Sequence, residues 1–141
     1  LKRTLLLVAV TVVIAAVVYR DWGAGPVATG DGLSAICERV VDGDTIKLVG
    51  GERVRYIGID TPETVDPRRP VEPFGKEASD YNRALVEGRR VRIEMDVRER
   101  DRYGRLLGYV YVHDEATGEE LFVNAELVRA GYARVSTVPP A

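Results

Sequence analysis

Two kinds of apolar pattern divide the chain. Residues 4–19 form an almost uninterrupted apolar run, with Lys2 and Arg3 before it and Arg20 directly after it. Further along, apolar runs of strand length alternate with turn residues, a pattern typical of a small β-rich domain. The pattern therefore predicts an N-terminal apolar helix followed by one folded domain.

The apolar run is predicted to be a signal peptide or a membrane anchor over residues 1–20. As a helix, residues 4–19 would be roughly 24 Å long, which is short of the ~30 Å hydrocarbon core unless the flanking basic side chains reach the interface. Arg20, Asp21 and Trp22 separate the run from the first small residues, and Pro26 interrupts the Gly/Ala stretch beyond them, so the sequence offers a poor cleavage site and favours an uncleaved anchor. Because basic residues precede the run, we expect an exported protein, either anchored in the membrane through residues 4–19 with an extracytoplasmic domain or secreted after cleavage.

A glycine-rich segment follows the apolar run. Residues 21–33 are predicted to form a flexible linker, which leaves residues 34–141 as the folded domain. Within this domain, alternating patterns and turn signals predict strands at residues 36–41, 45–49, 53–59, 89–97, 106–112 and 121–122. Apolar residues at helical spacing predict helices at residues 74–86 and 123–130, and a glycine follows each of them closely.

The order of these elements predicts a β-barrel with helices, of the α+β class. Apart from the short edge strand at residues 121–122, five strands are predicted, with one helix inserted after the third and another following the fifth, which is typical of the OB-fold, a five-stranded Greek-key barrel. A chain of 141 residues has room for one such domain beside the N-terminal segment. We expect a monomer, because no protein partner is evident from the sequence.

Composition excludes several classes of chemistry. The single cysteine, Cys37, excludes an internal disulfide and a cysteine-rich zinc site, and we predict a buried, unreactive side chain. The single histidine, His113, excludes a site with two histidine ligands and is predicted at the surface end of a strand. The formal net charge of -2 conceals a cluster of arginines between Arg89 and Arg105, so the overall charge does not exclude a polyanionic partner.

Acidic residues gather at the ends of predicted strands. Asp44 and Asp60 each lie at the boundary of an apolar strand, where a single acid is most often a solvated turn residue. Together with Glu63, and beside Arg55, they would instead supply the hard oxygen ligands that calcium prefers. These residues alone leave both interpretations open.

A predicted hairpin contributes a second arginine. The segment Asp-Arg-Tyr-Gly-Arg at residues 101–105 places Tyr103 and Arg105 in a tight turn. Cleavage of a phosphodiester needs an activated water and compensation for the charge on a five-coordinate phosphorus, which a metal ion and guanidinium groups can supply together. The arginines would act as electrophiles and not as bases, because arginine stays protonated.

Five motifs in sequence order make a resemblance specific. They are Asp-Gly-Asp-Thr-Ile-Lys-Leu at residues 42–48, Arg-Tyr-Ile-Gly-Ile-Asp-Thr-Pro-Glu-Thr at 55–64, Phe-Gly-Lys-Glu-Ala-Ser at 74–79, Asp-Arg-Tyr-Gly-Arg at 101–105 and Asn-Ala-Glu-Leu-Val-Arg-Ala-Gly at 124–131. Together they resemble the signature of the staphylococcal nuclease-like (thermonuclease) family and extend over nearly the whole predicted domain. The resemblance implies a calcium-dependent enzyme that hydrolyses phosphodiester bonds of DNA and RNA, with single strands favoured.

The resemblance also implies which residues bind the metal and activate water. Asp44 and Asp60 would bind calcium through their carboxylates, and Thr61 would bind it through its backbone carbonyl. Glu63 would hold or deprotonate the attacking water. The expected cofactor is therefore Ca²⁺.

Further residues match the family's substrate-binding positions. Arg55 and Arg105 would bind the scissile phosphate, and Arg105 would also assist the leaving 5'-oxygen, which gives 3'-phosphorylated products. Tyr103, Arg68 and Arg69 match positions that contact the substrate. For these three, an exposed loop side chain is the alternative interpretation.

Two departures from the family pattern affect the expected grip on substrate and the stability of the domain. Thr137 occupies the position of a second substrate-contacting tyrosine, and Pro139 replaces a nearby aromatic residue. Each lost stacking contact would cost roughly 1–3 kcal/mol of binding. The chain also ends at Ala141, before the C-terminal helix of the secreted bacterial prototype, which indicates either lower stability or a truncated chain.

Two other classes of function compete with the enzyme. A non-catalytic OB module that binds single-stranded nucleic acid would lose the set of acids and arginines, which this chain keeps. A membrane-anchored structural protein with solvated charges would not concentrate such residues at the ends of strands. The complete set of catalytic positions therefore favours the nuclease.

Overall fold

The fold is given by a computed structural model that describes residues 25–30, 32–64, 67–68, 70, 72–114 and 116–137. The predicted signal peptide or anchor at residues 1–20 lies outside the described residues. Within the described part, no helix combines the length and hydropathy needed to cross a membrane. In chain order the elements are β1 (Val27–Thr29), β2 (Gly32–Asp42), β3 (Thr45–Leu48), β4 (Arg53–Tyr56), β5 (Ile59–Asp60), α2 (Gly75–Val86), β6 (Arg90–Arg100), β7 (Leu106–His113), β8 (Glu120–Phe122), α3 (Val123–Arg129) and β9 (Arg134–Val135).

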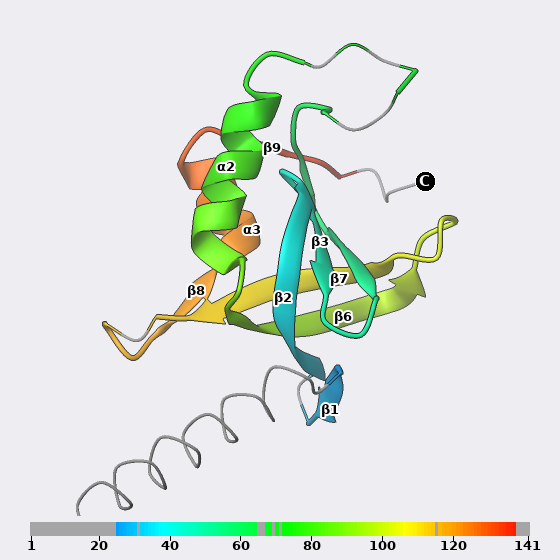
Figure 1. Cartoon of the computed structure of the whole chain (residues 1–141), viewed down its shortest axis with the longest axis vertical. Coiled ribbons are helices and arrows are strands. Elements are labelled where there is room, and N and C mark those ends of the chain that lie inside the picture. The colour runs from blue at the N-terminus through cyan, green and yellow to red at the C-terminus, as the bar shows by residue number, and fades with distance from the viewer. Residues whose placement is uncertain are drawn as a thin grey trace, which may run out of the picture.

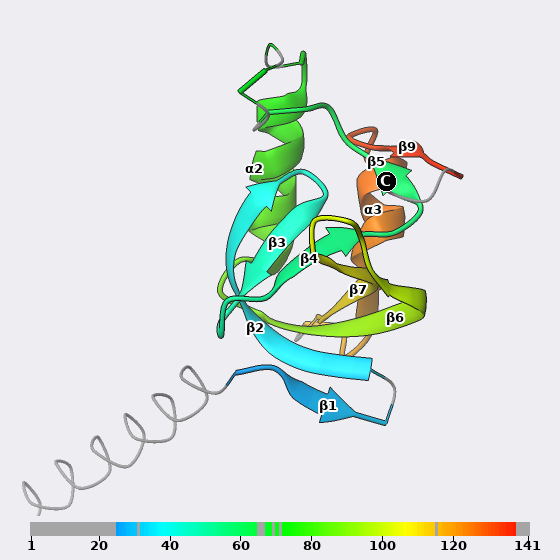
Figure 2. The ribbon, with the colours of Figure 1, turned by 90° about the vertical axis from the view of Figure 1, so that its right-hand side faces the viewer.

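Five strands close into a barrel. β2 pairs antiparallel with β3 and β3 with β4, while β4 runs parallel to β7. β7 then pairs antiparallel with β6, which returns to β2 and completes the ring. This is the Greek-key order of the OB-fold, and the chain forms α2 between the third and fourth barrel strands (Figure 1, Figure 2). The predicted fold class is confirmed.

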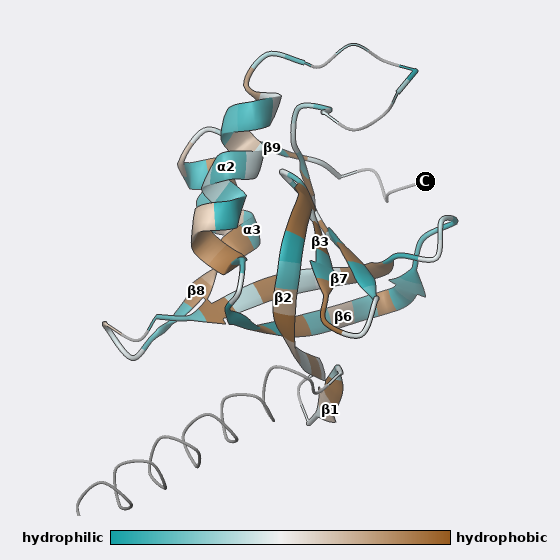
Figure 3. Ribbon diagram, viewed as in Figure 1, coloured by the Kyte–Doolittle hydropathy of each residue, from teal (hydrophilic) through white to brown (hydrophobic). Residues whose placement is uncertain are grey.

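Apolar and polar residues alternate along parts of the barrel strands (Figure 3), and the buried apolar side chains form the core. Cys37 is fully buried among them, and burial raises the pKa of its thiol to about 12. The prediction of an unreactive cysteine is therefore confirmed, and so is the exposed position of His113 at the end of β7. The largest fully buried aliphatic side chains are Ile46, Leu48, Val54, Val86, Val91, Ile93, Val110, Val112, Val123 and Leu127.

Two strands begin inside the segment predicted as a linker. β1 pairs with the start of β2, and Leu33 faces Ile93 across the pairing of β2 with β6. A Cβ atom at Gly32 would lie 2.1 Å from the carbonyl oxygen of Ile93, so only glycine permits this approach. The predicted end of the linker at residue 33 is therefore corrected. Backbone pairing, which apolar periodicity does not reveal, brings residues 27–29 and 32–33 into the sheet.

The strand predicted at residues 53–59 is divided in two. β4 ends at Tyr56, and the chain then turns at Gly58, which has a φ of 77°. β5 leaves the barrel and pairs antiparallel with β9. The turn thus places Asp60 beside the barrel, opposite Arg134. The apolar pattern of residues 53–59 does not reveal this turn.

Helix α2 is hydrogen-bonded to β4 and to the end of β2. The hydroxyl of the buried Tyr56 donates a 2.9 Å hydrogen bond to Asn82 Oδ1, and Asn82 Nδ2 lies 3.4 Å from the carbonyl oxygen of Asp42. The helix begins one residue later than predicted, because Phe74 is in the left-handed region with a φ of 66°. These contacts hold the first acidic motif against a rigid helix.

Asn124 fastens α3 to the barrel and provides a test of the fold. Its side-chain oxygen accepts a hydrogen bond from the Val110 amide at 2.9 Å, and its amide donates to the carbonyl of Ile57 at 2.9 Å. Asn124→Ala should leave these backbone groups without partners and lower the free energy of unfolding by about 2–4 kcal/mol in a denaturant titration. Glu119→Ala, at an exposed position, should change it by less than ~0.5 kcal/mol. Equal stabilities would contradict the role of Asn124.

Candidate active site

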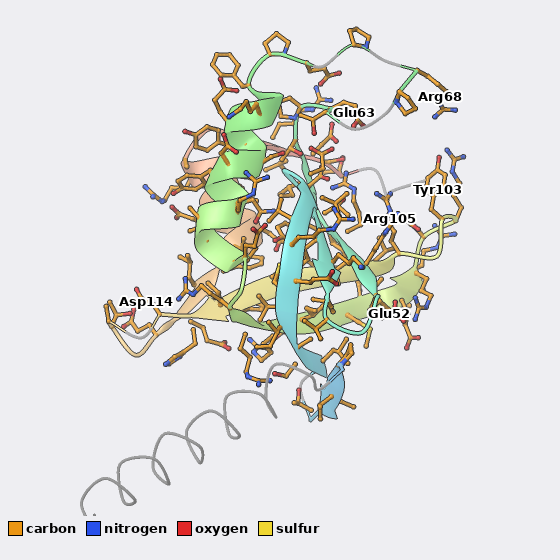
Figure 4. All side chains as sticks on the ribbon, viewed as in Figure 1. Glu52, Glu63, Arg68, Tyr103, Arg105 and Asp114 are labelled. Carbon is orange, nitrogen blue, oxygen red and sulfur yellow. The ribbon has the colours of Figure 1, made fainter. Side chains whose placement is uncertain are left out.

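A cleft of about 570 Å³ lies between the β2–β3 turn, β4, the segment that follows β5 and the β6–β7 hairpin. Figure 4 shows Glu63, Arg68, Tyr103 and Arg105 on one side of the molecule, with Asp114 on the other. The cleft brings together every predicted site residue except Arg69, which lies outside the described residues. Its lining consists of Val41, Asp42, Asp44, Thr45, Arg53, Arg55, Asp60, Thr61, Glu63, Pro67, Arg68, Tyr103 and Arg105.

Asp44 and Arg55 form a well-shielded ion pair in the cleft. Asp44 ends the β2–β3 turn, and Arg55 lies on β4 opposite Thr45, the next residue along the chain. Arg55 Nη1 is 2.7 Å from Asp44 Oδ2, and the two side chains are only 13% and 8% exposed. Because water screens this pair poorly, the Coulomb attraction between its two charges is stronger than in an ion pair on the surface.

Asp60 lies on the other side of the same guanidinium. Its Oδ1 is 3.5 Å from Arg55 Nη2, while its Oδ2 is 2.8 Å from Arg134 Nη2. Arg55 thus bridges Asp44 and Asp60, two acids that are 16 positions apart in the sequence. The bridge shows that both carboxylates converge on one positively charged group.

Thr61 connects the two acidic segments through its backbone and its side chain. Its amide donates a 3.1 Å hydrogen bond to Asp44 Oδ2. Its buried hydroxyl has no hydrogen-bond partner among the described residues. A Cβ atom at Gly43 would lie 2.7 Å from this hydroxyl, so the glycine of the Asp-Gly-Asp turn makes room for Thr61.

The segment that carries Glu63 is tied to the barrel by hydrogen bonds. The Thr64 hydroxyl donates to Asp42 Oδ1 at 2.7 Å, and the Thr64 amide donates to Glu63 Oε1 at 3.0 Å. The Glu63 amide donates to Glu72 Oε2 at 3.0 Å. Burial raises the pKa of Asp42, and the bonds from Thr64 and Gly43 oppose that rise. Asp42 therefore anchors the segment beside Glu63.

The β6–β7 hairpin positions Arg105 through Asp101. The Asp101 side chain is fully buried, and its Oδ2 is 2.6 Å from Arg105 Nε. Its Oδ1 accepts hydrogen bonds from the amides of Tyr103 and Arg105 at 2.9 and 3.0 Å. Gly104, with a φ of 78°, allows the turn between them. One carboxylate thus fixes both the turn and the guanidinium.

The predicted substrate-binding residues lie at the rim. Tyr103 is 63% exposed, and the guanidinium carbons of Arg102 and Arg105 are 4.8 and 5.4 Å from the centre of its ring. Arg68 lies on the segment after β5 and also lines the cleft. This arrangement combines an aromatic face with guanidinium groups, which suits a single-stranded polyanion.

The acids of the cleft fit a hard cation in chemistry. Asp44 and Asp60 offer carboxylate oxygens, the ligand type that calcium prefers, and both already face one positive group. Within the described residues, however, no three His, Cys, Asp or Glu side chains come together as a metal-binding group. A cation at this place would therefore need backbone and water oxygens as further ligands.

The residues of the cleft fall largely within a stretch that matches a known family. The family model described as "Staphylococcal nuclease homologue" matches residues 53–141. The chain belongs to this family. The resemblance predicted from the five motifs is therefore confirmed.

Several named proteins are similar to this chain over different lengths. Thermonuclease of Staphylococcus intermedius is 42% identical over 142 aligned residues, which cover 96% of this chain and 80% of that protein. Thermonuclease of Staphylococcus hyicus is 47% identical over 105 residues, 72% of this chain and 59% of the relative. Endonuclease YncB of Bacillus subtilis is 43% identical over 105 residues, 72% of this chain and 47% of the relative. This chain thus spans less than two thirds of the last two.

Three residues in or beside the cleft were not singled out from the sequence, namely Asp42, Asp101 and Arg134. Asp42 and Asp101 lie within motifs that were recognised, and the local turn chemistry of Asp101 with its own hairpin amides could have identified it. Arg134 gives no local signal, because its partner Asp60 is 74 positions away. Only the pairing of β5 with β9 brings the two together.

Proposed function

We propose that this chain is a calcium-dependent nuclease that hydrolyses phosphodiester bonds of DNA and RNA and leaves 3'-phosphorylated products. The cleft that gathers Asp44, Asp60 and Glu63 with Arg55 and Arg105 is the observation that carries the proposal. Membership of the staphylococcal nuclease family and the names thermonuclease and endonuclease of its relatives support it.

In this proposal the carboxylates of Asp44 and Asp60 and the backbone carbonyl of Thr61 hold Ca²⁺. The bound ion would supply positive charge near the phosphate and favour deprotonation of water. The buried Asp44 has a fixed orientation, because the Thr61 amide and Arg55 both bond to its Oδ2. Fixed oxygens of this kind reduce the ordering that ion binding requires.

Glu63 and the two arginines carry out the displacement at phosphorus. Glu63 takes a proton from water as the water oxygen bonds to phosphorus, and the bond from phosphorus to the 5'-oxygen breaks. Arg55 and Arg105 donate hydrogen bonds to the phosphate oxygens and offset the negative charge that grows there. The 5'-oxygen, to which Arg105 also donates, then gains a proton from solvent, so that a 3'-phosphate and a 5'-hydroxyl result.

The rim favours single strands as substrates. The exposed ring of Tyr103 can stack on a base that is free of its complement, and such a contact contributes about 1–3 kcal/mol. Arg68 supplies a cation for a neighbouring phosphate. We therefore infer faster cleavage of single-stranded than of double-stranded DNA.

The proposal is tested by cleavage of fluorogenic single-stranded DNA and RNA by the full chain. We expect activity with calcium, none with excess chelator and recovery on adding calcium back. Asp44→Asn should weaken calcium binding by at least about tenfold, because it removes a charged ligand. Asp114→Asn is the matched control, since Asp114 lies on the far side of the molecule (Figure 4).

The outcomes separate the candidate functions. Equal cleavage rates with calcium and with chelator would exclude the metal role. Tight binding of single strands without cleavage in any metal would instead support a non-catalytic OB module. Products that carry a 5'-phosphate, detected by end labelling before and after phosphatase treatment, would contradict the proposed direction of bond cleavage.

A further inference from the structure

Strand β9 carries an arginine that the proposed mechanism does not use. β9 pairs antiparallel with β5, and the register places Arg134 directly opposite Asp60. The Ser136 amide donates a 2.8 Å hydrogen bond to the carbonyl of Gly58, which extends this pairing. Directly opposed residues of antiparallel strands lie on the same face, so the register itself keeps the two side chains together.

The two oxygens of Asp60 have different partners. Oδ1 is 3.5 Å from Arg55 Nη2, whereas Oδ2 accepts from Arg134 Nη2 at 2.8 Å and from Arg134 Nε at 3.2 Å. The Arg55 side chain is 13% exposed and that of Arg134 is 81% exposed. Asp60 therefore has two cationic partners. Arg55 is enclosed by the cleft, whereas Arg134 is exposed to solvent and can leave the carboxylate easily.

Arg134 lines a second cavity next to the cleft. This cavity of about 330 Å³ shares Asp60 and Thr61 with the cleft, and Tyr132 and Arg134 lie on its wall. Asp60 thus lines both spaces. A nucleic-acid strand that leaves the cleft past Asp60 would meet Arg134 next.

We propose that Arg134 is an exchangeable counter-ion of Asp60. It neutralises the carboxylate before a cation binds, and its guanidinium turns to a phosphate of the nucleic acid once calcium occupies Asp60. The inference rests on the proposed calcium-binding role of Asp60. Calcium and the guanidinium compete for one carboxylate because both are positive and repel each other there. Released from Asp60, the guanidinium is a strong donor to phosphate, so Arg134 is a binding residue and not a catalytic one.

The first measurement is the calcium affinity of the full chain, by isothermal titration with calcium chloride and no nucleic acid. Arg134→Gln should bind calcium about two- to fivefold more tightly, since the competing ion pair is exposed and weak. Arg129→Gln is the matched control, because Arg129 is 73% exposed and pairs with Glu126. It should leave the calcium affinity unchanged. Arg134→Lys, which keeps the charge, should fall between the parent and Arg134→Gln.

The second measurement is the salt dependence of binding to a short oligothymidylate, made in a Glu63→Gln background to prevent cleavage. With saturating calcium, Arg134→Gln should reduce the slope of log affinity against log salt by about 0.7, the value for one phosphate contact on a single strand. With chelator the reduction should be smaller, because Arg134 is then engaged by Asp60. Arg129→Gln should show no such dependence on calcium.

The outcomes distinguish failure of this inference from failure of the proposed function. If Asp60→Asn leaves calcium binding intact, the metal role of Asp60 is wrong and the counter-ion role falls with it. If Asp60→Asn abolishes calcium binding but Arg134→Gln behaves like Arg129→Gln, only the counter-ion role is overturned. Weaker calcium binding in Arg134→Gln would also overturn it, because the arginine would then be supporting the ion.

Discussion

Glu63→Gln is expected to lower the single-turnover cleavage rate about 10²- to 10⁴-fold, the usual effect of removing a general base. The amide of glutamine cannot take a proton from water at neutral pH, whereas its oxygen can still accept the hydrogen bond from the Thr64 amide. The segment should therefore keep its shape. Affinities for calcium and for single-stranded DNA should change little, so that the loss falls on kcat and not on KM.

Glu52→Gln is the matched control for this substitution. Glu52, labelled in Figure 4, pairs with Arg100 at 2.9 Å and is not among the residues that line the cleft. Its replacement should leave the rate within about twofold of the parent, as is usual for surface ion pairs. Unchanged activity in Glu63→Gln would remove Glu63 as the base. Similar losses in both variants would indicate a general defect, which a comparison of their unfolding curves would detect.

Arg105→Lys is expected to lower kcat about 10²- to 10³-fold, although the charge is kept. The Nε–H of Arg105 is used on Asp101 at 2.6 Å, which fixes the plane of the guanidinium and leaves its other nitrogens to act as a fork. A lysine ammonium cannot bond to Asp101 and also reach a phosphate with two parallel donors. The loss should appear in single-turnover rates measured at saturating calcium and substrate.

Arg102→Lys is the control for Arg105→Lys. Arg102 lies on the same hairpin, and its guanidinium contacts the ring and the hydroxyl of the exposed Tyr103. The substitution should reduce binding slightly and leave kcat near that of the parent. Asp101→Asn should lower kcat in the same direction as Arg105→Lys, since it weakens the anchor without touching the guanidinium. If Arg105→Lys and Arg102→Lys had equal rates, the transition-state role of Arg105 would be refuted.

What could be predicted from the sequence depends on how far apart the contacts are. Asp44 and Arg105 each lie in a short motif at a predicted turn, so the sequence was enough to single them out as candidates, and the structure places both in the cleft. The barrel strands were also found, because one buried face produces an alternating pattern. The break at Gly58 was missed, since the residues on both sides are apolar and only the backbone φ of 77° reveals the turn.

Contacts between distant segments set the limit of prediction. The linker was predicted too long because the pairing of Leu33 with Ile93 joins residues that are 60 positions apart. Arg134 was missed for the same reason, because no local pattern states which strand β9 will meet. The Arg55 bridge was suggested only in part. The sequence placed Arg55 near the acids, and the fold then put it between them.

The bridge formed by Arg55 has a consequence for the chain before any ion arrives. A carboxylate as buried as Asp44 would strongly oppose folding if it had no positive partner. Arg55 supplies that partner from within the chain, unlike small zinc domains, in which the metal itself must stabilise the fold. Folding of this site therefore does not depend on a bound cation. If the proposed calcium dependence holds, the chain would fold in calcium-poor surroundings and stay inactive there until calcium is supplied.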